Sequence, residues 1–415
     1  MLGRRLRALE RVTVMPDQGR VDSAGILIIG AGIAGLSLAT GLGRQGFNVT
    51  VIDGASCPTA PELGSGLGDW DLRVSALTPA SIRFLTEIGA WKGASVHRAA
   101  PYGSMRVWDA NGRGRIGFNA GEVDAPSLGH IVENREIVQA LVQCAHAMPG
   151  VELVWEEALE ALSPAAPGWL VMGSSGRQFE AALAIGADGA RSRARQLLGM
   201  PTREWSYDQT ALVATVGLAS EHAATCWQVF LKSGPLALLP LADPLKVAIV
   251  WSLDNATHSQ IADLPDAAFV EALNRAIGPS APAAAAVGPR ASFPLSQRHA
   301  VDYCDESFAL IADAAHSIHP LAGQGINLGL TDVAVLTAEL LAAREGGLGL
   351  SSSVPLRRYQ RRRKTENLAM MAAMEGFKRG FGTLNPLAVV GRNLGLDLVD
   401  RQSWIKRWFM RHAIS

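Results

Sequence analysis

Three glycines and an aspartate near the start of the chain have a spacing that suits nucleotide binding. Gly30, Gly32 and Gly35 follow an apolar run in the pattern GxGxxG, and Asp53 stands 23 residues after Gly30. The first glycine allows a tight turn, the second lets a pyrophosphate approach the backbone, and the third lets a helix pack closely on the strand. The helix start offers N–H groups to phosphates, and the acid can accept from ribose hydroxyls. The pattern predicts a strand–helix–strand unit over 25–53 that binds a dinucleotide, with NAD and FAD both open.

A second stretch that could do chemistry surrounds two histidines. Residues 308–343 read as a short strand, a glycine-punctuated loop and a long apolar helix. His316 and His319 lie three residues apart on that loop, which invites a metal-site or general-base interpretation. Because Asp313 is the one nearby acid and no cysteine set of ligand spacing accompanies it, the sequence predicts no metal site.

Other elements must position these residues. Within 71–91, a loop leads into an amphipathic helix that Pro79 opens. A hairpin is expected over 104–120 around an Asn-Gly turn, and 130–148 has helical spacing. The strand-rich stretch 205–298 predicts a second sheet that covers one face of the nucleotide domain.

An arginine-rich segment lies near the end of the chain. It predicts a helix with a solvated basic face, and a surface that meets anionic lipid is the alternative. The residues of this segment are Arg357, Arg358, Arg361, Arg362, Arg363 and Lys364.

Composition excludes several classes of protein. The 38 Lys and Arg residues balance the 38 Asp and Glu residues, so there is no electrostatic case for a nucleic-acid partner. Four scattered cysteines without a CxxC pair make a disulfide framework or zinc site unexpected and indicate a reducing compartment. No uninterrupted apolar run reaches the roughly 18 residues of a membrane span. The segment 1–24 is expected to be a solvated tail, with a membrane-surface helix, a transit peptide or a true start at Met15 as alternatives.

Three separated motifs together resemble the single-component FAD-dependent aromatic hydroxylases, which are para-hydroxybenzoate hydroxylase-like. They are the GxGxxG unit with its acid, the Asp-Gly motif at 186–195, and a second FAD fingerprint from Asp313 onward. Within that class, residues 313–333, 73–81 and 395–413 are similar to the ubiquinone-biosynthesis hydroxylases, which oxidise a polyprenylated phenol ring.

The resemblance implies an α/β fold with a Rossmann-like, GR2-type FAD-binding domain, an interleaved β-sheet substrate domain and C-terminal helices. The FAD-binding domain is expected over 25–100, 125–195 and 300–345. The substrate domain is expected over 101–124 and 196–299, and the C-terminal helical region over 346–415.

The resemblance also implies roles for individual residues. Asp313 is expected to accept from the ribityl chain or ribose of FAD. Arg73 and Arg135 are expected to contact the flavin or pyrophosphate, with ordinary surface salt bridges as the alternative. Asp188 and Arg195 are expected to shape the edge of the nucleotide site. The full set of expected cofactor-binding residues is Gly30, Gly32, Gly35, Asp53, Arg73, Arg135, Asp188, Asp313, Gly325 and Asn327.

The glycine-rich loop carries the expected catalytic residues. Backbone N–H groups from Gly323 to Asn327 are expected to face the flavin and stabilise negative charge on the reduced ring. Pro320 stiffens the approach to the reaction cavity, and His319 is a candidate substrate contact. The expected catalytic set is Pro320, Gly323, Gln324 and His319, and the sequence identifies no base for the phenol.

The sequence departs from the family pattern at two positions. Ala312 stands where the second fingerprint usually has glycine before Asp313. The substitution is expected to cost little unless the backbone there requires a positive φ. Asp53 replaces the commoner glutamate, and either carboxylate can reach a ribose.

The implied reaction uses NADH or NADPH to reduce FAD, and O₂ then forms a flavin C4a-hydroperoxide that hydroxylates the phenol. The protein is expected to be cytoplasmic and peripheral on the inner membrane, with other ubiquinone-biosynthesis proteins as expected partners, and a homo-oligomer stays open. Two alternatives remain: a related hydroxylase of a soluble aromatic or secondary metabolite, and a non-catalytic FAD-binding subunit of a quinone-synthesis complex. A flavin halogenase is disfavoured because no W-x-W-x-I-P segment occurs.

Overall fold

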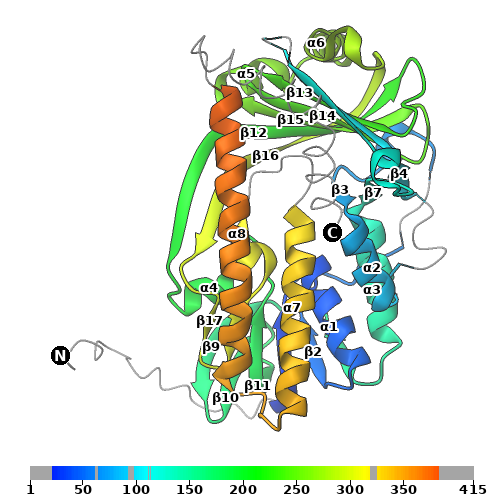
Figure 1. Ribbon diagram of the computed structural model, residues 1–415. Coiled ribbons are helices and arrows are strands. Elements are labelled where there is room, and N and C mark those ends of the chain that lie inside the picture. Colours follow the sequence, from blue (N-terminus) through cyan, green and yellow to red (C-terminus); the bar gives the residue numbers. More distant parts are fainter. Residues whose placement is uncertain are drawn as a thin grey trace.

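The computed structural model describes residues 21–60, 64–91, 98–110, 112, 114–317 and 325–382. Two eight-stranded sheets lie at opposite ends of the molecule, with helices packed along one side (Figure 1). The expectations for the N-terminal tail before residue 21, the loop 318–324 and the segment 383–415 lie outside the described residues.

The first sheet contains the predicted strand–helix–strand unit, which is confirmed. Strand β1 (Val21–Ile29) pairs in parallel with β2 (Val49–Ile52) and with β11 (Gln178–Gly186). Its apolar residues from Ile26 to Ile29 are buried, as expected for a parallel strand covered on both faces. Helix α1 (Ile33–Arg44) follows the glycine turn, and its residues from Gly35 to Leu42 are buried.

The order of this sheet is β17-β18-β11-β1-β2-β8, and β10 and β9 extend it beside β11. The carboxyl ends of β1 and β11 therefore lie side by side, which brings two of the sequence motifs together. The remaining strands are β8 (Val151–Val154), β9 (Leu159–Ala165), β10 (Gly168–Gly173), β17 (Cys304–Asp305) and β18 (Phe308–Leu310).

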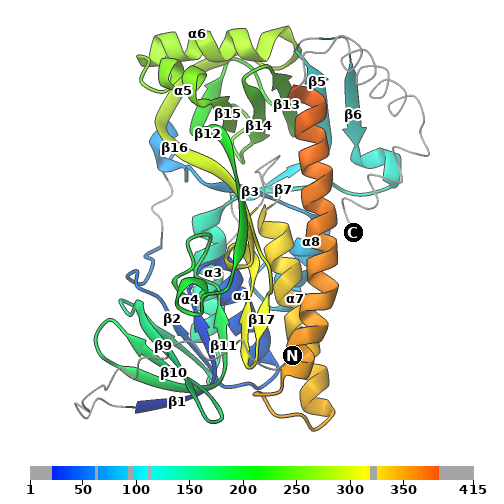
Figure 2. The ribbon, with the colours of Figure 1, turned by 90° about the vertical axis from the view of Figure 1, so that its left-hand side faces the viewer.

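The second sheet has the order β19-β16-β12-β15-β14-β13-β5-β6. Its two longest strands are β12 (Thr202–Leu218) and β16 (Ala284–Ala300), which pair antiparallel. Their lower ends extend down toward the first sheet (Figure 2). The predicted second sheet is thus confirmed, and so is the hairpin, formed by β5 (Ser104–Asp109) and β6 (Arg115–Asn119). The other strands are β13 (Thr225–Leu231), β14 (Gly234–Pro240), β15 (Lys246–Asp254) and β19 (His316–Ser317).

Helices α5 (Asn255–Ile261) and α6 (Asp266–Ile277) lie over the outer face of the second sheet (Figure 2). A three-stranded sheet lies between the two large ones, in the order β3-β7-β4. Its strands are β3 (Val74–Leu77), β4 (Ala100–Tyr102) and β7 (Gly129–Glu133), and two helices adjoin it, α2 (Pro79–Glu87) and α3 (Asn134–His146). As predicted, Pro79 opens α2, and the Thr78 side chain caps it by accepting from Ser81 N–H.

Two long helices connect the layers. Helix α7 (Gly325–Glu345) packs against α1 and α8, and α8 (Ser353–Gly382) runs along the length of the molecule (Figure 1). Among the described helices, α7 is long and apolar enough to span a membrane. It also carries buried Asn327, Asp332 and Glu339, and its apolar residues Leu330, Val333 and Leu336 belong to the main core, so α7 is a core helix in this fold.

Candidate cofactor-binding site

The glycine turn after β1 has the geometry that its sequence predicts. Gly30 has a φ of +109°, and a Cβ there would lie 2.6 Å from the carbonyl oxygen of Ala187. A Cβ on Gly35 would lie only 1.9 Å from the carbonyl oxygen of Gly30, so α1 can approach the turn only with glycine there. Within the described part of the chain, a Cβ on Gly32 would meet no heavy atom within 4 Å, so the backbone there is open to a ligand.

The start of α1 is prepared for an anionic ligand. No side chain caps it at Gly32, and its first turn holds no acidic residue. Asp53 lies beside it because its Oδ2 accepts from the Ala31 N–H at 2.6 Å and its Oδ1 from the Ala55 N–H at 2.8 Å. The structure therefore brings the glycine turn, a helix N-terminus and the acid together, as a nucleotide site requires.

Asp188 lies at the end of β11, next to this turn. Its Oδ2 accepts from the Ala194 N–H at 3.0 Å, and its buried Oδ1 has no hydrogen-bond partner among the described residues. Burying a carboxylate oxygen without a hydrogen-bond donor costs free energy. A donor group on a bound ligand could pair with this atom. Arg195 instead links two motifs, because it is buried and its Nη1 donates to the carbonyl oxygen of Ala314 at 2.6 Å.

Asp313 lies in a 3₁₀ turn, η5 (Ala312–Ala314), directly after β18. Its side chain is solvent-accessible, yet the surrounding protein is dense enough that burial raises the pKa of its carboxyl. The charges of His316 and Arg73 oppose that rise in the pKa of Asp313.

The two arginines expected at the flavin differ. Arg135 Nη2 donates to the buried Glu133 carboxylate at 2.8 Å and to the carbonyl oxygen of Asp69, and Glu133 also pairs with Arg98 Nε at 3.1 Å. Arg135 therefore forms a salt bridge with a buried carboxylate and not an ordinary surface one, and its contact with the flavin or pyrophosphate stays a prediction. Arg73 is exposed, its charge favours the ionised form of Asp313, and its contact with the flavin or pyrophosphate stays a prediction.

The described part of the glycine-rich loop is the start of α7. The Asn327 side chain donates to the Ala76 carbonyl at 2.8 Å and accepts from Thr78 N–H at 3.0 Å and from Ser81 Oγ at 2.7 Å. It therefore fixes α7 to β3 and α2, and its expected contact with the cofactor stays a prediction. A Cβ on Gly325 would meet no heavy atom of the described residues within 4 Å. Pro320, Gly323, Gln324 and His319 lie outside the described residues.

The sequence missed two residues next to this site. The prediction that Arg363 lies on a solvated face is wrong. Its side chain is 1% exposed, and its Nε donates to Asp332 at 2.7 Å. Asp332 in turn accepts from His316 Nε2 at 2.6 Å. The spacing of Leu356, Tyr359 and Arg363 on one buried stripe of α8 is the signal that could have found this arginine.

The backbone at Ala312 does adopt the positive φ at which replacing glycine by alanine was expected to be costly. Its φ is +51°, a left-handed conformation that favours glycine, so the departure from the family pattern does introduce local strain.

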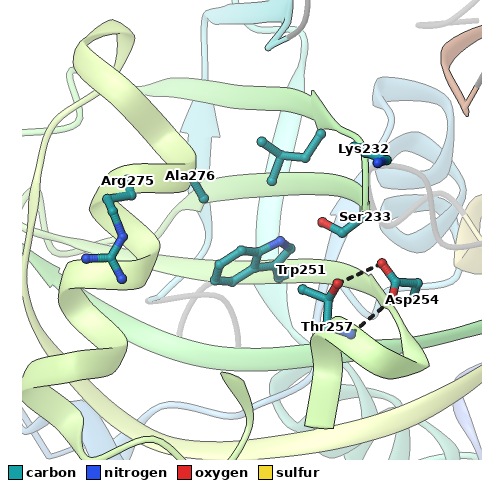
Figure 3. Close-up of a pocket in the computed structure, with 8 residues that line it drawn as sticks. Lys232, Ser233, Trp251, Asp254, Thr257, Arg275 and Ala276 are labelled. Carbon is teal, nitrogen blue, oxygen red and sulfur yellow. Dashed lines mark hydrogen bonds between the residues drawn. The ribbon is translucent and has the colours of Figure 1, made fainter. Parts of the chain in front are cut away.

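A cavity of about 580 Å³ lies elsewhere, on the outer side of the second sheet (Figure 3). Figure 3 shows Asp254 accepting from Thr257, at 2.9 Å from N–H and 2.8 Å from Oγ1, beside Trp251. No residue of the three motifs lines this cavity. Within the described ranges, no group of three or more His, Cys, Asp and Glu side chains could hold a metal ion.

These features define a dinucleotide-binding protein whose residues fit FAD. The fit rests on the open space at Gly32, the uncapped α1, the unpaired Asp188 Oδ1 and the accessible Asp313. Residues 23–373 match the family model described as FAD binding domain, and the chain belongs to that family.

Curated relatives and a solved structure extend this comparison. The chain is 36% identical over 393 residues to the 3-demethoxyubiquinol 3-hydroxylase of Escherichia coli, covering 94% of this chain and 98% of the relative. It is 35% identical over 400 residues to the ubiquinone hydroxylase UbiL of Rhodospirillum rubrum, covering 96% and 91%. The p-nitrophenol 4-monooxygenase of Pseudomonas putida has the same fold, with a TM-score of 0.75 and 18% identity over 94% of this chain and 98% of that structure.

Proposed function

We propose that this protein is an FAD-dependent monooxygenase that adds one hydroxyl group to the aromatic ring of a polyprenylated phenol in ubiquinone biosynthesis. The observation that carries the proposal is the match over nearly the whole length of both chains to the E. coli 3-demethoxyubiquinol 3-hydroxylase. The solved p-nitrophenol 4-monooxygenase is 18% identical to this chain, so it supports the fold but gives no reason to prefer a small phenol as the substrate.

The residues at the first motif divide the work of holding the cofactor. The N–H groups at the start of α1 bind the pyrophosphate, and the bare backbone at Gly32 lets it approach. Asp53, fixed by the Ala31 and Ala55 N–H groups, accepts from the adenosine ribose. When bound, FAD supplies the redox chemistry that links NADH or NADPH to O₂.

The residues at the second fingerprint orient the flavin end. Asp313 accepts from the ribityl chain, and the charge of Arg73 favours its ionised form. The N–H groups in the first turn of α7 would stabilise negative charge on the flavin ring, and Asn327 holds that helix start in place from β3 and α2. No described side chain is assigned as the base for the phenol.

The polyprenyl tail requires a route from the membrane. Each buried CH₂ contributes about 0.8 kcal/mol, so a tail of several isoprene units stays in the bilayer unless the protein meets it there. We therefore include a peripheral position on the membrane, alongside other proteins of the same pathway, in the proposal. Flotation with vesicles that contain anionic lipid tests it: the protein is expected to float with them at low salt, and recovery in the bottom fraction would contradict the membrane position.

Mass spectrometry of quinone lipids tests the function directly. Cells that lack the gene are expected to accumulate a prenylphenol one hydroxyl group short of the normal intermediate, and the wild-type gene restores the profile. The Asp313→Ala gene is expected to fail, whereas Asp305→Ala, a change at an exposed aspartate on β17, is expected to restore it. An unchanged lipid profile in the deletion strain would contradict the proposed substrate.

A further inference from the structure

A buried carboxylate on α7 holds the turn that carries Asp313. The Oδ2 of Asp332 accepts from the Ala312 N–H at 2.9 Å and from His316 Nε2 at 2.6 Å, so it bonds residues on both sides of Asp313. Its Oδ1 accepts from Arg363 Nε at 2.7 Å, on α8. One fully buried group therefore joins the turn, α7 and α8.

Electrostatics make this junction strongly dependent on Arg363. Burial disfavours an ionised Asp332, but the charges and hydrogen bonds of His316 and Arg363 outweigh it and lower the pKa of the carboxyl. The Arg363 guanidinium also donates from Nη2 to Asn367 Oδ1 at 2.8 Å and pairs with Glu366. Removing the arginine would leave Asp332 buried without its cationic partner on α8, a change that proteins tolerate poorly.

The hydrogen bonds of Asp332 and Arg195 hold the backbone on either side of Asp313 and leave the Asp313 side chain accessible. Ala312 has a φ of +51°, a conformation that persists in a non-glycine residue only when the surroundings hold it. Asp332 holds Ala312 from one side, and Arg195 holds the Ala314 carbonyl from the other at 2.6 Å. The Asp313 side chain itself remains solvent-accessible, free to meet a ligand.

We propose that Arg363 is a positioning residue for the flavin: through Asp332 it fixes the Ala312–Ala314 turn, so that α8 takes part in FAD binding without touching the cofactor. This inference rests on the proposed role of Asp313 as an FAD contact. It gives a function within the cofactor site to one member of the arginine-rich segment, whose neighbours Arg357, Arg358 and Arg361 are exposed.

The test compares Arg363→Met with Arg361→Met, a matched change at an exposed position two residues earlier on α8. FAD is removed, and the dissociation constant of the apoprotein for FAD is measured by quenching of flavin fluorescence. Arg363→Met is expected to raise that constant at least about tenfold, and Arg361→Met to leave it within about twofold. Thermal midpoints with and without FAD are recorded in parallel, because weaker binding must shrink the stabilisation that FAD confers.

A structural role alone would give a different pattern. If Arg363→Met lowers the apo and holo midpoints equally and leaves the FAD dissociation constant unchanged, the proposal is wrong. Should Arg363→Met not fold, Arg363→Lys decides, since lysine keeps the charge but lacks the planar fork. A several-fold weaker FAD affinity in the lysine variant supports the proposal, and wild-type affinity overturns it. Because the readout is FAD binding, an enzyme that hydroxylates a different substrate leaves this result intact.

Discussion

Replacing Gly32 by alanine separates the cofactor from the fold more cleanly than any other change in the glycine turn. The φ of Gly32 is −75°, which alanine adopts without strain, and its Cβ would meet no heavy atom of the residues that the structure describes within 4 Å. The apoprotein is therefore expected to keep its stability, or to gain up to about 1 kcal/mol because alanine restricts the unfolded chain. The new methyl group would project into the space that the pyrophosphate enters.

The expected loss of FAD affinity follows from that overlap. Forcing one methyl group into a close-packed contact costs about 1–3 kcal/mol, which corresponds to an increase in the FAD dissociation constant of about 5-fold to 150-fold. The assay is titration of apoprotein with FAD, together with the thermal midpoint of the apoprotein alone. Gly349→Ala is the matched control, because a Cβ there also meets open space but lies between α7 and α8, away from the motif residues.

Gly35→Ala should behave in the opposite way. Its Cβ would lie 1.9 Å from the Gly30 carbonyl oxygen, a backbone atom that cannot move without separating α1 from β1. That variant is expected to lose apoprotein stability together with FAD. If Gly32→Ala bound FAD with wild-type affinity, or if it destabilised the apoprotein as Gly35→Ala does, the assignment of the two glycines would be refuted.

Three further predictions concern the second fingerprint and its surroundings. Ala312→Gly is expected to raise the free energy of unfolding by about 0.5–1 kcal/mol. The left-handed conformation costs alanine about 1–2 kcal/mol, which exceeds the stability lost because glycine gives the unfolded chain more freedom. A loss of stability in urea titration would argue against strain at this turn. Asp313→Ala is expected to lose bound FAD and activity together, and a purified variant with full flavin occupancy would refute the assigned role. Burial lowers the pKa of His299 to about 4, with the charge of His316 adding to the effect. Between pH 6.5 and 4, His299 takes up a proton in the unfolded chain but not in the folded protein. The stability of the wild type relative to His299→Gln is therefore full above pH 6.5 and is expected to fall by about 3 kcal/mol as the pH reaches 4. A pH-independent difference would show that His299 is protonated alike in both states.

The sequence predicted the parts of the site that depend on contiguous residues. The unit from Ile26 to Asp53 contains its strand, its turn and its helix in one stretch, so local pattern was sufficient to place the glycines and the acid. The second sheet was likewise visible as a series of short apolar strands. The Asp-Gly motif and the second fingerprint were recognised as motifs, and the adjacent ends of β1 and β11 explain why the first two meet.

The sequence could not predict side-chain partners that are far apart in the chain. Asn327 bonds Ala76, about 250 residues away, and this contact exists only after β3 and α7 pack together. Arg363 was taken as part of a solvated basic face because six cationic residues lie within 357–364, and composition alone does not say which of them turns inward. An isolated acid in an apolar helix, Asp332, was the sign that a buried cation had to lie opposite it.

Incorporation of labelled oxygen tests the central claim most directly. The FAD-loaded protein is incubated under ¹⁸O₂ with NADH or NADPH and a short-chain prenylphenol in detergent, and the product is analysed by mass spectrometry. The expected product carries one ¹⁸O atom and forms in proportion to the nicotinamide nucleotide consumed. Oxidation of NADH or NADPH with no ¹⁸O in any phenol, or labelling of soluble phenols with none in the prenylated one, would contradict that claim.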